Sequence, residues 1–472
     1  KLAYQINENN EVELAWEISI EDINSSEDWW VFAVNAANGS IINKYNLFNN
    51  CNILDEHNDL FHSGVPSKLN SQTNEKIDFS AYLKVAAPAE ESAMVASYNV
   101  YAMPNESPHH GSTARQVVSG IEGTGSPFGW HDTDGSAGAE FTVTTGNNVD
   151  SRKGTIRADG GASLTFNTPH DLTMEPTTAD NVLSATVNLF YWNNITHDLL
   201  WEYGFDEAAG NFQENNYSNG GLGSDSVFAN AQAPGNCNAN FGTPSDGVNP
   251  TMNMFNCNIA SPSRDGDFDN GVIVHEYAHG ISNRLTGGGA NTGCLNNQEQ
   301  MGEGWSDFYG LIMTIESGDA GTDARGIGTW LLGTGPDGPG VRTERYSTDM
   351  SIYTKTYANL PSAVIPHGVG EIWAEMLWEM TWGLIANHGV DANIYNFTGD
   401  VSLDKGNVMA LALVTEGLKL QPCSPGFVDG RDAILAADVA LYGGANACTI
   451  WTAFAKRGLG FSADQGSTSS RS

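Results

Sequence analysis

The residues best suited to chemistry lie in the segment Val272-Ile-Val-His275-Glu276-Tyr-Ala-His279-Gly280. On a helix, residues four positions apart share one face, so the imidazoles of His275 and His279 can point at one ion. Glu276 then lies beside the open coordination position, where it can take a proton from a zinc-bound water. The spacing His-Glu-x-x-His therefore predicts a zinc site with Glu276 as general base, although the motif alone is only moderately specific.

A second acidic segment strengthens this prediction. Met301-Gly-Glu303-Gly-Trp-Ser-Asp307-Phe falls on the next expected helix. Glu303 would complete a His₂Glu ligand set with one position left for water. Asp307, four residues on, could accept the second N–H of a ligating histidine and hold its tautomer. The alternative for both acids is a solvated helix face, which the histidine motif just upstream disfavours.

These motifs, with others along the chain, resemble the fungalysin family of thermolysin-like metallopeptidases. The zinc motif continues as Gly-Ile-Ser-Asn-Arg-Leu-Thr-Gly-Gly and is followed by Gly302-Glu-Gly-Trp-Ser-Asp. The resemblance covers roughly residues 90–462. Its other motifs are Ser126-Pro-Phe-Gly-Trp-His-Asp, Thr145-Gly-Asn-Asn-Val, Gly204-Phe-Asp-Glu-Ala-Ala-Gly-Asn-Phe-Gln, His367-Gly-Val-Gly-Glu-Ile-Trp-Ala, Leu418-Lys-Leu-Gln-Pro-Cys-Ser-Pro and Ala453-Phe-Ala-Lys-Arg-Gly-Leu-Gly.

The resemblance implies an α+β, thermolysin-like fold with a β-rich lobe and a mainly helical lobe on either side of a substrate cleft. It also implies that His367 stabilises the oxyanion that develops during peptide hydrolysis. The alternative is a histidine that only begins a helix. Thermolysin-like enzymes orient this histidine with an Asp just upstream, but residues 360–366 contain none. Glu371 or a more distant carboxylate could take that part.

Two substrate-binding residues are implied in the same way. Asn238, in Asn238-Ala-Asn-Phe, resembles the start of an edge strand that binds the substrate backbone. Arg342 resembles the arginine that steadies the pocket beyond the cleaved bond. Turn formation is the alternative for Asn238. For Arg342 the alternatives are a structural salt bridge and a competing role for Arg345.

The first 50 residues resemble the end of the propeptide that these enzymes carry. The resembling stretch is Trp29-Trp-Val-Phe-Ala-Val-Asn-Ala-Ala-Asn-Gly followed by Ser40-Ile-Ile. The resemblance implies that this module helps the enzyme to fold, inhibits it and is later cut away. Cys51 lies just beyond the module and could bind the zinc as a thiolate, but the even number of cysteines favours a disulfide.

The pattern of apolar residues divides the chain into three parts: 1–50, 51–270 and 271–472. The first part predicts hairpins, because alternating runs flank an Asn38-Gly39 turn. The second is rich in short β-prone runs and in Gly, Asn and Ser. Helices are predicted over residues 181–205, 271–284, 302–316, 367–384, 406–420 and 428–442.

The six cysteines form no Cys-x-x-Cys pair, so they suit disulfides in an oxidising compartment. Proximity in the sequence favours Cys237–Cys257 and Cys423–Cys448, which leaves Cys51 with Cys294. No run of about 18 apolar residues predicts a membrane span. Residue 1 falls in a strand-like run, so we expect the numbering to begin after processing or truncation.

Charge narrows the range of partners. The 56 acidic and 21 basic residues give a net charge of −35, which disfavours nucleic acid and anionic membranes as partners. Some of the acids could bind Ca²⁺, but no Asp-x-Asp-x-Asp-Gly loop locates such a site.

The sequence therefore predicts a secreted zinc endopeptidase, made as a latent precursor, that acts on proteins and peptides as a monomer, with no membrane as a partner. Two other readings are open. A non-catalytic scaffold is disfavoured by the intact Glu276, and an enzyme that trims peptide ends is disfavoured by the expected open edge strand.

Overall fold

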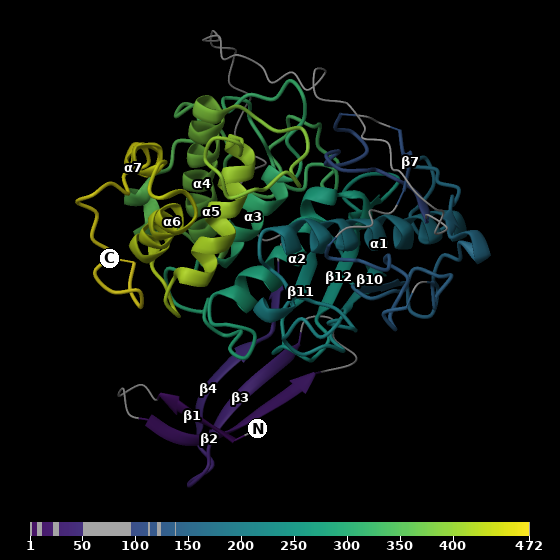
Figure 1. The fold of residues 1–472 in the computed structure, drawn as a ribbon, viewed down its shortest axis with the longest axis horizontal. Coiled ribbons are helices and arrows are strands. Elements are labelled where there is room, and N and C mark those ends of the chain that lie inside the picture. Colours follow the sequence, from purple (N-terminus) through teal and green to yellow (C-terminus); the bar gives the residue numbers. More distant parts are fainter. Residues whose placement is uncertain are drawn as a thin grey trace.

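The computed structural model describes residues 2–6, 12–21, 28–50, 96–111, 114–119, 124–136 and 138–471. Figure 1 shows a small N-terminal sheet that projects from the main body of the molecule. Within the main body, the principal sheet and α1 lie on one side and the C-terminal helices on the other. The fold is thus mixed α/β, with a β-rich N-terminal region and a helical C-terminal part, as the sequence predicts.

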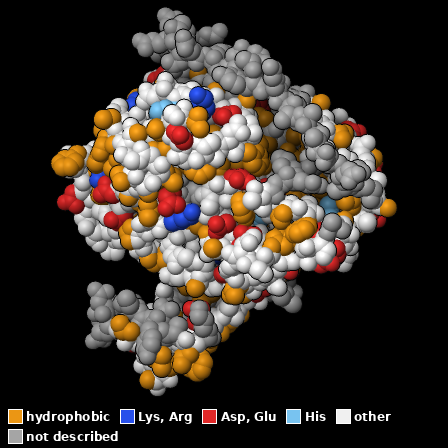
Figure 2. Space-filling view, viewed as in Figure 1, with side chains coloured by type: hydrophobic (Ala, Val, Ile, Leu, Met, Phe, Trp, Pro, Cys, Tyr) orange, Lys and Arg blue, Asp and Glu red, His pale blue; other side chains and the backbone are white. Residues whose placement is uncertain are grey.

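The projecting module is a four-stranded antiparallel sheet in the order β1-β2-β3-β4. The predicted turn at Asn38-Gly39 joins β3 to β4, and Gly39 has a φ of +75°, which suits glycine. Along β2, alternate apolar side chains from Val12 to Ile20 are exposed, and Figure 2 shows apolar groups on this part of the molecule. The strands are β1 (Leu2–Ile6), β2 (Val12–Glu21), β3 (Trp29–Asn35) and β4 (Ile41–Asn46).

The principal sheet has six strands, in the order β5-β11-β12-β10-β8 with β13 paired to β12. Strand β5 directly follows the N-terminal module, yet it pairs antiparallel with β11 of the main body. A smaller sheet has the order β7-β6-β9. The bounds are β5 (Phe48–Asn50), β6 (Ser97–Val100), β7 (Gln116–Ser119), β8 (Val149–Arg152), β9 (Thr165–Phe166), β10 (Val227–Ala233), β11 (Ala239–Gly242), β12 (Thr251–Cys257) and β13 (Arg264–Asp265).

Two buried helices support the site. Helix α1 (Ala179–Glu202) packs against β6, β8, β10 and α2. It ends where Gly204 takes a φ of +84°, a conformation that terminates helices readily. Helix α2 (Asn270–Leu285) is buried along its whole length, as expected of a helix at the centre of a large core.

Helices α3 (Gly302–Ile312) and α4 (His367–His388) approach each other very closely. A Cβ on Gly304 would lie 2.3 Å from the backbone oxygen of Gly370, and a Cβ on Gly370 would lie 2.4 Å from the Cβ of Glu303. Glycine at both positions is therefore what allows the two helices to bring Glu303 and His367 together.

Three more helices complete the C-terminal part: α5 (Gly406–Leu420), α6 (Phe427–Tyr442) and α7 (Ala447–Lys456). The sequence predicted all of these helices except α7, and it extended α3 to Glu316. Helix α3 ends earlier because the backbone N–H of Glu316 donates to Asp319 Oδ2 at 2.8 Å, a local bond that competes with helix geometry. Among the described residues, no helix is both long and apolar enough to cross a membrane.

The disulfides correct part of the sequence prediction. Cys237–Cys257 forms as expected, but Cys294 pairs with Cys423 and Cys448 is free and exposed. The predicted pairs Cys423–Cys448 and Cys51–Cys294 are therefore wrong. The 16-residue helix α6 lies between Cys423 and Cys448 and spans about 24 Å, so closeness in sequence does not bring them together. Cys51 itself lies outside the described residues.

Peptide mapping without reduction tests this connectivity. We expect a cross-linked peptide pair containing Cys294 and Cys423, and we expect Cys448 to be alkylated by iodoacetamide before any reductant is added, because its side chain is exposed. Alkylation after reduction is the control, since it should label every cysteine. A cross-link between Cys423 and Cys448 would contradict the structure.

Candidate metal centre

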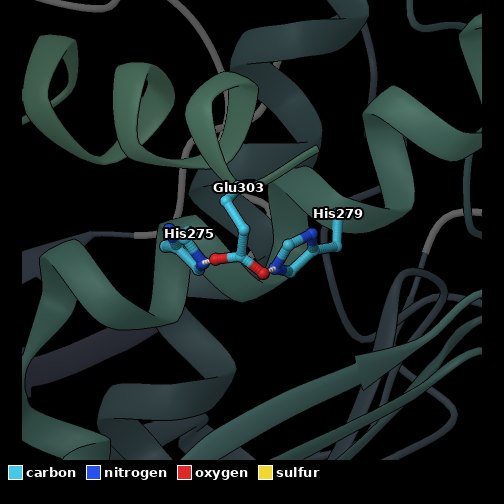
Figure 3. A group of neighbouring side chains, drawn as sticks. All are labelled: His275, His279 and Glu303. Carbon is cyan, nitrogen blue, oxygen red and sulfur yellow. Dashed lines mark ion pairs between the residues drawn. The ribbon is translucent and has the colours of Figure 1, made fainter. Parts of the chain in front are cut away.

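Two helices present three side chains to one point in the core. His275 and His279 lie one turn apart on α2, and Glu303 reaches between them from the first turn of α3 (Figure 3). Their donor atoms all lie within 4.8 Å of one another, and all three residues are buried. The structure thus brings together the three ligands that the sequence predicts.

The distances suit a tetrahedral ion. The Glu303 carboxylate lies with Oε2 3.3 Å from His275 Nε2 and with Oε1 3.6 Å from His279 Nε2. Tetrahedral zinc with bonds near 2.0–2.1 Å holds its ligand atoms about 3.4 Å apart. One ion could therefore bind both imidazoles and the carboxylate with little movement.

The state of His279 supports the same conclusion. Both of its ring nitrogens are buried, and neither makes a hydrogen bond within the part of the chain that the structure describes. Burial lowers the pKa of His279 to about 3, so its imidazole is neutral, which is the form that binds metals. A buried imidazole without a hydrogen bond is costly unless it binds something, so the donor set fits zinc.

Charged neighbours hold the carboxylates in their ionised form. Asp307 Oδ1 accepts a hydrogen bond from His275 Nδ1 at 2.7 Å, as predicted, which leaves Nε2 to face the metal position. Although burial opposes it, Arg342 and His275 keep the pKa of Asp307 below its usual range. Burial also opposes ionisation of Glu303, but His367 and Arg342 hold its pKa well below the usual value.

The two proposed catalytic residues adjoin the ligands, one along the chain and one in space. Glu276 is fully buried on α2, next in sequence to His275. His367 begins α4, as predicted, and its Nε2 lies 3.6 Å from Glu303 Oε1. Glu371, which the sequence analysis considered as a partner for His367, accepts hydrogen bonds from Thr343 and Glu344 and pairs with Lys355.

The predicted substrate-binding residues differ in their surroundings. Asn238 directly precedes β11, and its side chain is buried with Oδ1 free of hydrogen bonds to described residues. Arg342 is buried against the metal-binding residues: its Nη2 lies 3.0 Å from Glu303 Oε2, and its Nε lies 2.7 Å from Asp307 Oδ2. The alternative candidate Arg345 donates to the backbone oxygen of Asp337 instead.

The sequence did not identify one residue that contacts Asp307, namely Tyr346. Tyr346 is fully buried and its hydroxyl donates to Asp307 Oδ2. It follows Arg342 by four residues in a loop, where no periodic pattern relates the two, so spacing alone could not have identified it.

Only one other group of three acidic or metal-binding side chains clusters within the described ranges. It consists of Asp132, Asp134 and Glu140, of which the last two are exposed. Asp132 and Asp134 accept hydrogen bonds from backbone N–H groups of their own loop, and Glu140 from Thr133. These bonds account for the loop without an ion, so the cluster does not establish a Ca²⁺ site, which the acidic composition left open.

A buried His₂Glu set with a neighbouring glutamate is typical of metallopeptidases. The sequence model of the family described as "Fungalysin metallopeptidase (M36)" matches residues 97–463. The chain therefore belongs to the fungalysin metallopeptidase family, as its motifs predicted.

Curated relatives are similar over the same region. Extracellular metalloproteinase MEP of Pyricularia oryzae is 42% identical over 378 residues, which cover 77% of this chain and 58% of that protein. The protein of the same name from Leptosphaeria maculans is 42% identical, with coverages of 78% and 59%. Extracellular metalloproteinase 2 of Trichophyton rubrum is 41% identical, with coverages of 77% and 58%. The chain thus spans under two thirds of the length of these relatives.

Metal analysis tests the ligand set. We expect about one zinc per chain in the purified protein, since a His₂Glu set binds a single ion. His279→Ala should lose that zinc on dialysis, because it removes one of three protein ligands. Mass spectrometry of the metal content measures both. His388→Ala, a histidine on the last turn of α4 that pairs with Asn446, is the control and should keep its zinc. Retention of zinc by His279→Ala would exclude this site.

Proposed function

We propose that the chain is a secreted zinc endopeptidase that hydrolyses internal peptide bonds of proteins and is made as a latent precursor. The observation that carries this proposal is the buried convergence of His275, His279 and Glu303 beside Glu276. Membership of a metallopeptidase family supports it.

His275, His279 and Glu303 would hold the ion. When bound, zinc would supply a Lewis acid that polarises the scissile carbonyl and lowers the pKa of a water to about 7. Arg342 contributes a fixed positive charge beside Glu303, and Asp307 holds the tautomer of His275.

Glu276 is the general base in this mechanism. Its carboxylate accepts a proton from the attacking water and later delivers it to the departing amine. Because water attacks the carbonyl directly, no acyl-enzyme forms and no Ser or Cys nucleophile is needed. His367 donates a hydrogen bond to the carbonyl oxygen as negative charge develops there, which is supported by its position 3.6 Å from Glu303.

Strand β11 is the proposed docking edge for substrate. A peptide that pairs with it would form backbone hydrogen bonds that do not depend on sequence, as in other strand-addition complexes. Asn238, at the start of this strand, and Arg342 are the proposed polar contacts to the substrate.

The same edge suggests how latency arises. Phe48, Asn49 and Asn50 already pair antiparallel with Gly242, Phe241 and Asn240 of β11. We therefore propose that residues 1–50 are the end of a propeptide that occupies the substrate edge. Residues 51–270 and 271–472 would then be the two lobes of the catalytic unit.

Localisation and partners follow from composition and relatives. The relatives are named extracellular metalloproteinases, and two disulfides suit an oxidising compartment. We propose that the protein acts outside the cell as a monomer on protein and peptide substrates. Its net charge of −35 argues against nucleic acid as a partner.

Glu276→Gln tests the proposed base. We expect casein hydrolysis to fall at least about 100-fold, because loss of a general base typically costs that much. Zinc content should stay unchanged, since Glu276 is not a ligand. Glu416→Gln is the control and should keep full activity, because Glu416 is a partly exposed acid on α5 that pairs with Lys419 one turn away. Bound zinc with no hydrolysis by any form of the protein, cleaved or intact, would favour the scaffold interpretation.

Limited proteolysis near residue 50 tests the latency. Cleavage followed by removal of the N-terminal module should raise the rate of casein hydrolysis, because it frees β11 at the sheet edge. Glu276→Gln treated in the same way is the control and should gain nothing. An active intact chain whose rate is unchanged by cleavage would contradict an inhibitory role for the module.

A further inference from the structure

We propose that Tyr346 is a positioning residue of the metal centre, whose hydroxyl fixes the Asp307 carboxylate and thereby orients His275. This inference rests on the proposed zinc function, and it assigns a role to a residue that does not touch the ion.

Asp307 is held at both of its oxygens. Oδ1 accepts from His275 Nδ1 at 2.7 Å and from Arg342 Nη2 at 3.0 Å. Oδ2 accepts from Arg342 Nε at 2.7 Å and from the hydroxyl of Tyr346. The Tyr346 bond approaches Oδ2 from a separate loop residue, so together the donors fix the rotation of the carboxylate about its own axis.

Tyr346 is itself rigidly placed. Its ring is fully buried and stacks on Tyr353 with centroids 5.9 Å apart and an interplanar angle of 12°. Its backbone exchanges both hydrogen bonds with Arg325, at 2.8 and 2.9 Å. Arg325 in turn is anchored by ion pairs to Glu106 and Asp319. The hydroxyl is therefore a preorganised donor rather than a mobile one.

Tyr346 affects the metal position through one imidazole, that of His275. The Nδ1–H of His275 can donate to Asp307 only while the carboxylate keeps its orientation, and this bond directs Nε2 toward Glu303 and His279. Removing the Tyr346 hydroxyl leaves Oδ2 with Arg342 alone, so the carboxylate can turn toward the guanidinium and away from His275. Losing the partner that orients a ligating histidine typically lowers metal affinity 10–100-fold, and Tyr346 acts through that partner, Asp307.

Tyr353 provides a matched control. It is also fully buried in the same stacked pair, but its hydroxyl makes no hydrogen bond to any described residue. Tyr353→Phe thus removes the same atom from the same aromatic pair without touching Asp307.

The experiment measures zinc dissociation constants of the full chain by competition with a chelator. Tyr346→Phe should bind zinc about 10–100-fold more weakly than wild type, and Tyr353→Phe should match wild type. In an Asp307→Asn background, Tyr346→Phe should add little further loss, because the two residues act through one contact.

The outcomes separate this inference from the proposed function. Wild-type zinc affinity in Tyr346→Phe would overturn the positioning role and leave the zinc peptidase intact. Equal weakening in both phenylalanine variants, or fully additive losses in the Asp307→Asn background, would attribute the loss of zinc affinity to packing. Either result would also overturn the positioning role. A wild-type chain that binds no zinc would overturn the proposed function itself, and this inference with it.

Discussion

The rest of this structure depends on two carboxylates that are buried beside two imidazoles and one guanidinium. Glu303 and Asp307 are almost fully removed from water, and an isolated buried charge is costly. Arg342 pairs with both acids, and His275 donates to one of them. Helices α2 and α3 and the loop that carries Arg342 must therefore keep their relative positions, because displacing any one of them would leave a charge without its partner.

The packing around this cluster also keeps the buried charges next to their partners. Gly304 and Gly370 let α3 and α4 approach until their backbones nearly touch, which places His367 on the Glu303 side of the site. Helix α2 is buried on all sides, so the two histidines sit in a water-poor core rather than on a surface. A buried, preorganised set of donors reacts to a metal with little rearrangement, which suits both tight binding and catalysis.

The N-terminal module meets the main body at strand β11, where Phe48 and Trp29 lie against Gly242, and at the loop of Gly293, where Tyr45 packs. Its four strands form their own sheet, but β5 leaves that sheet and pairs with β11. Leu47 extends this connection, because its backbone oxygen accepts a hydrogen bond from Thr243. The backbone part of this contact is strand pairing, and it uses the edge that we propose for substrate.

The sequence by itself determined the local parts of this protein. Helical spacing related His275 to His279 and Glu303 to Asp307, the Asn38-Gly39 turn predicted the hairpin, and apolar periodicity located most helices, because each of these patterns is set by residues a few positions apart. The tertiary structure decided what depends on contact between distant segments: the pairing of Cys294 with Cys423, the place of Arg342 and Tyr346 on Asp307, and the pairing of β5 with β11. No periodicity links such residues, since their proximity results from how whole helices and strands pack, and only the packed core brings them together.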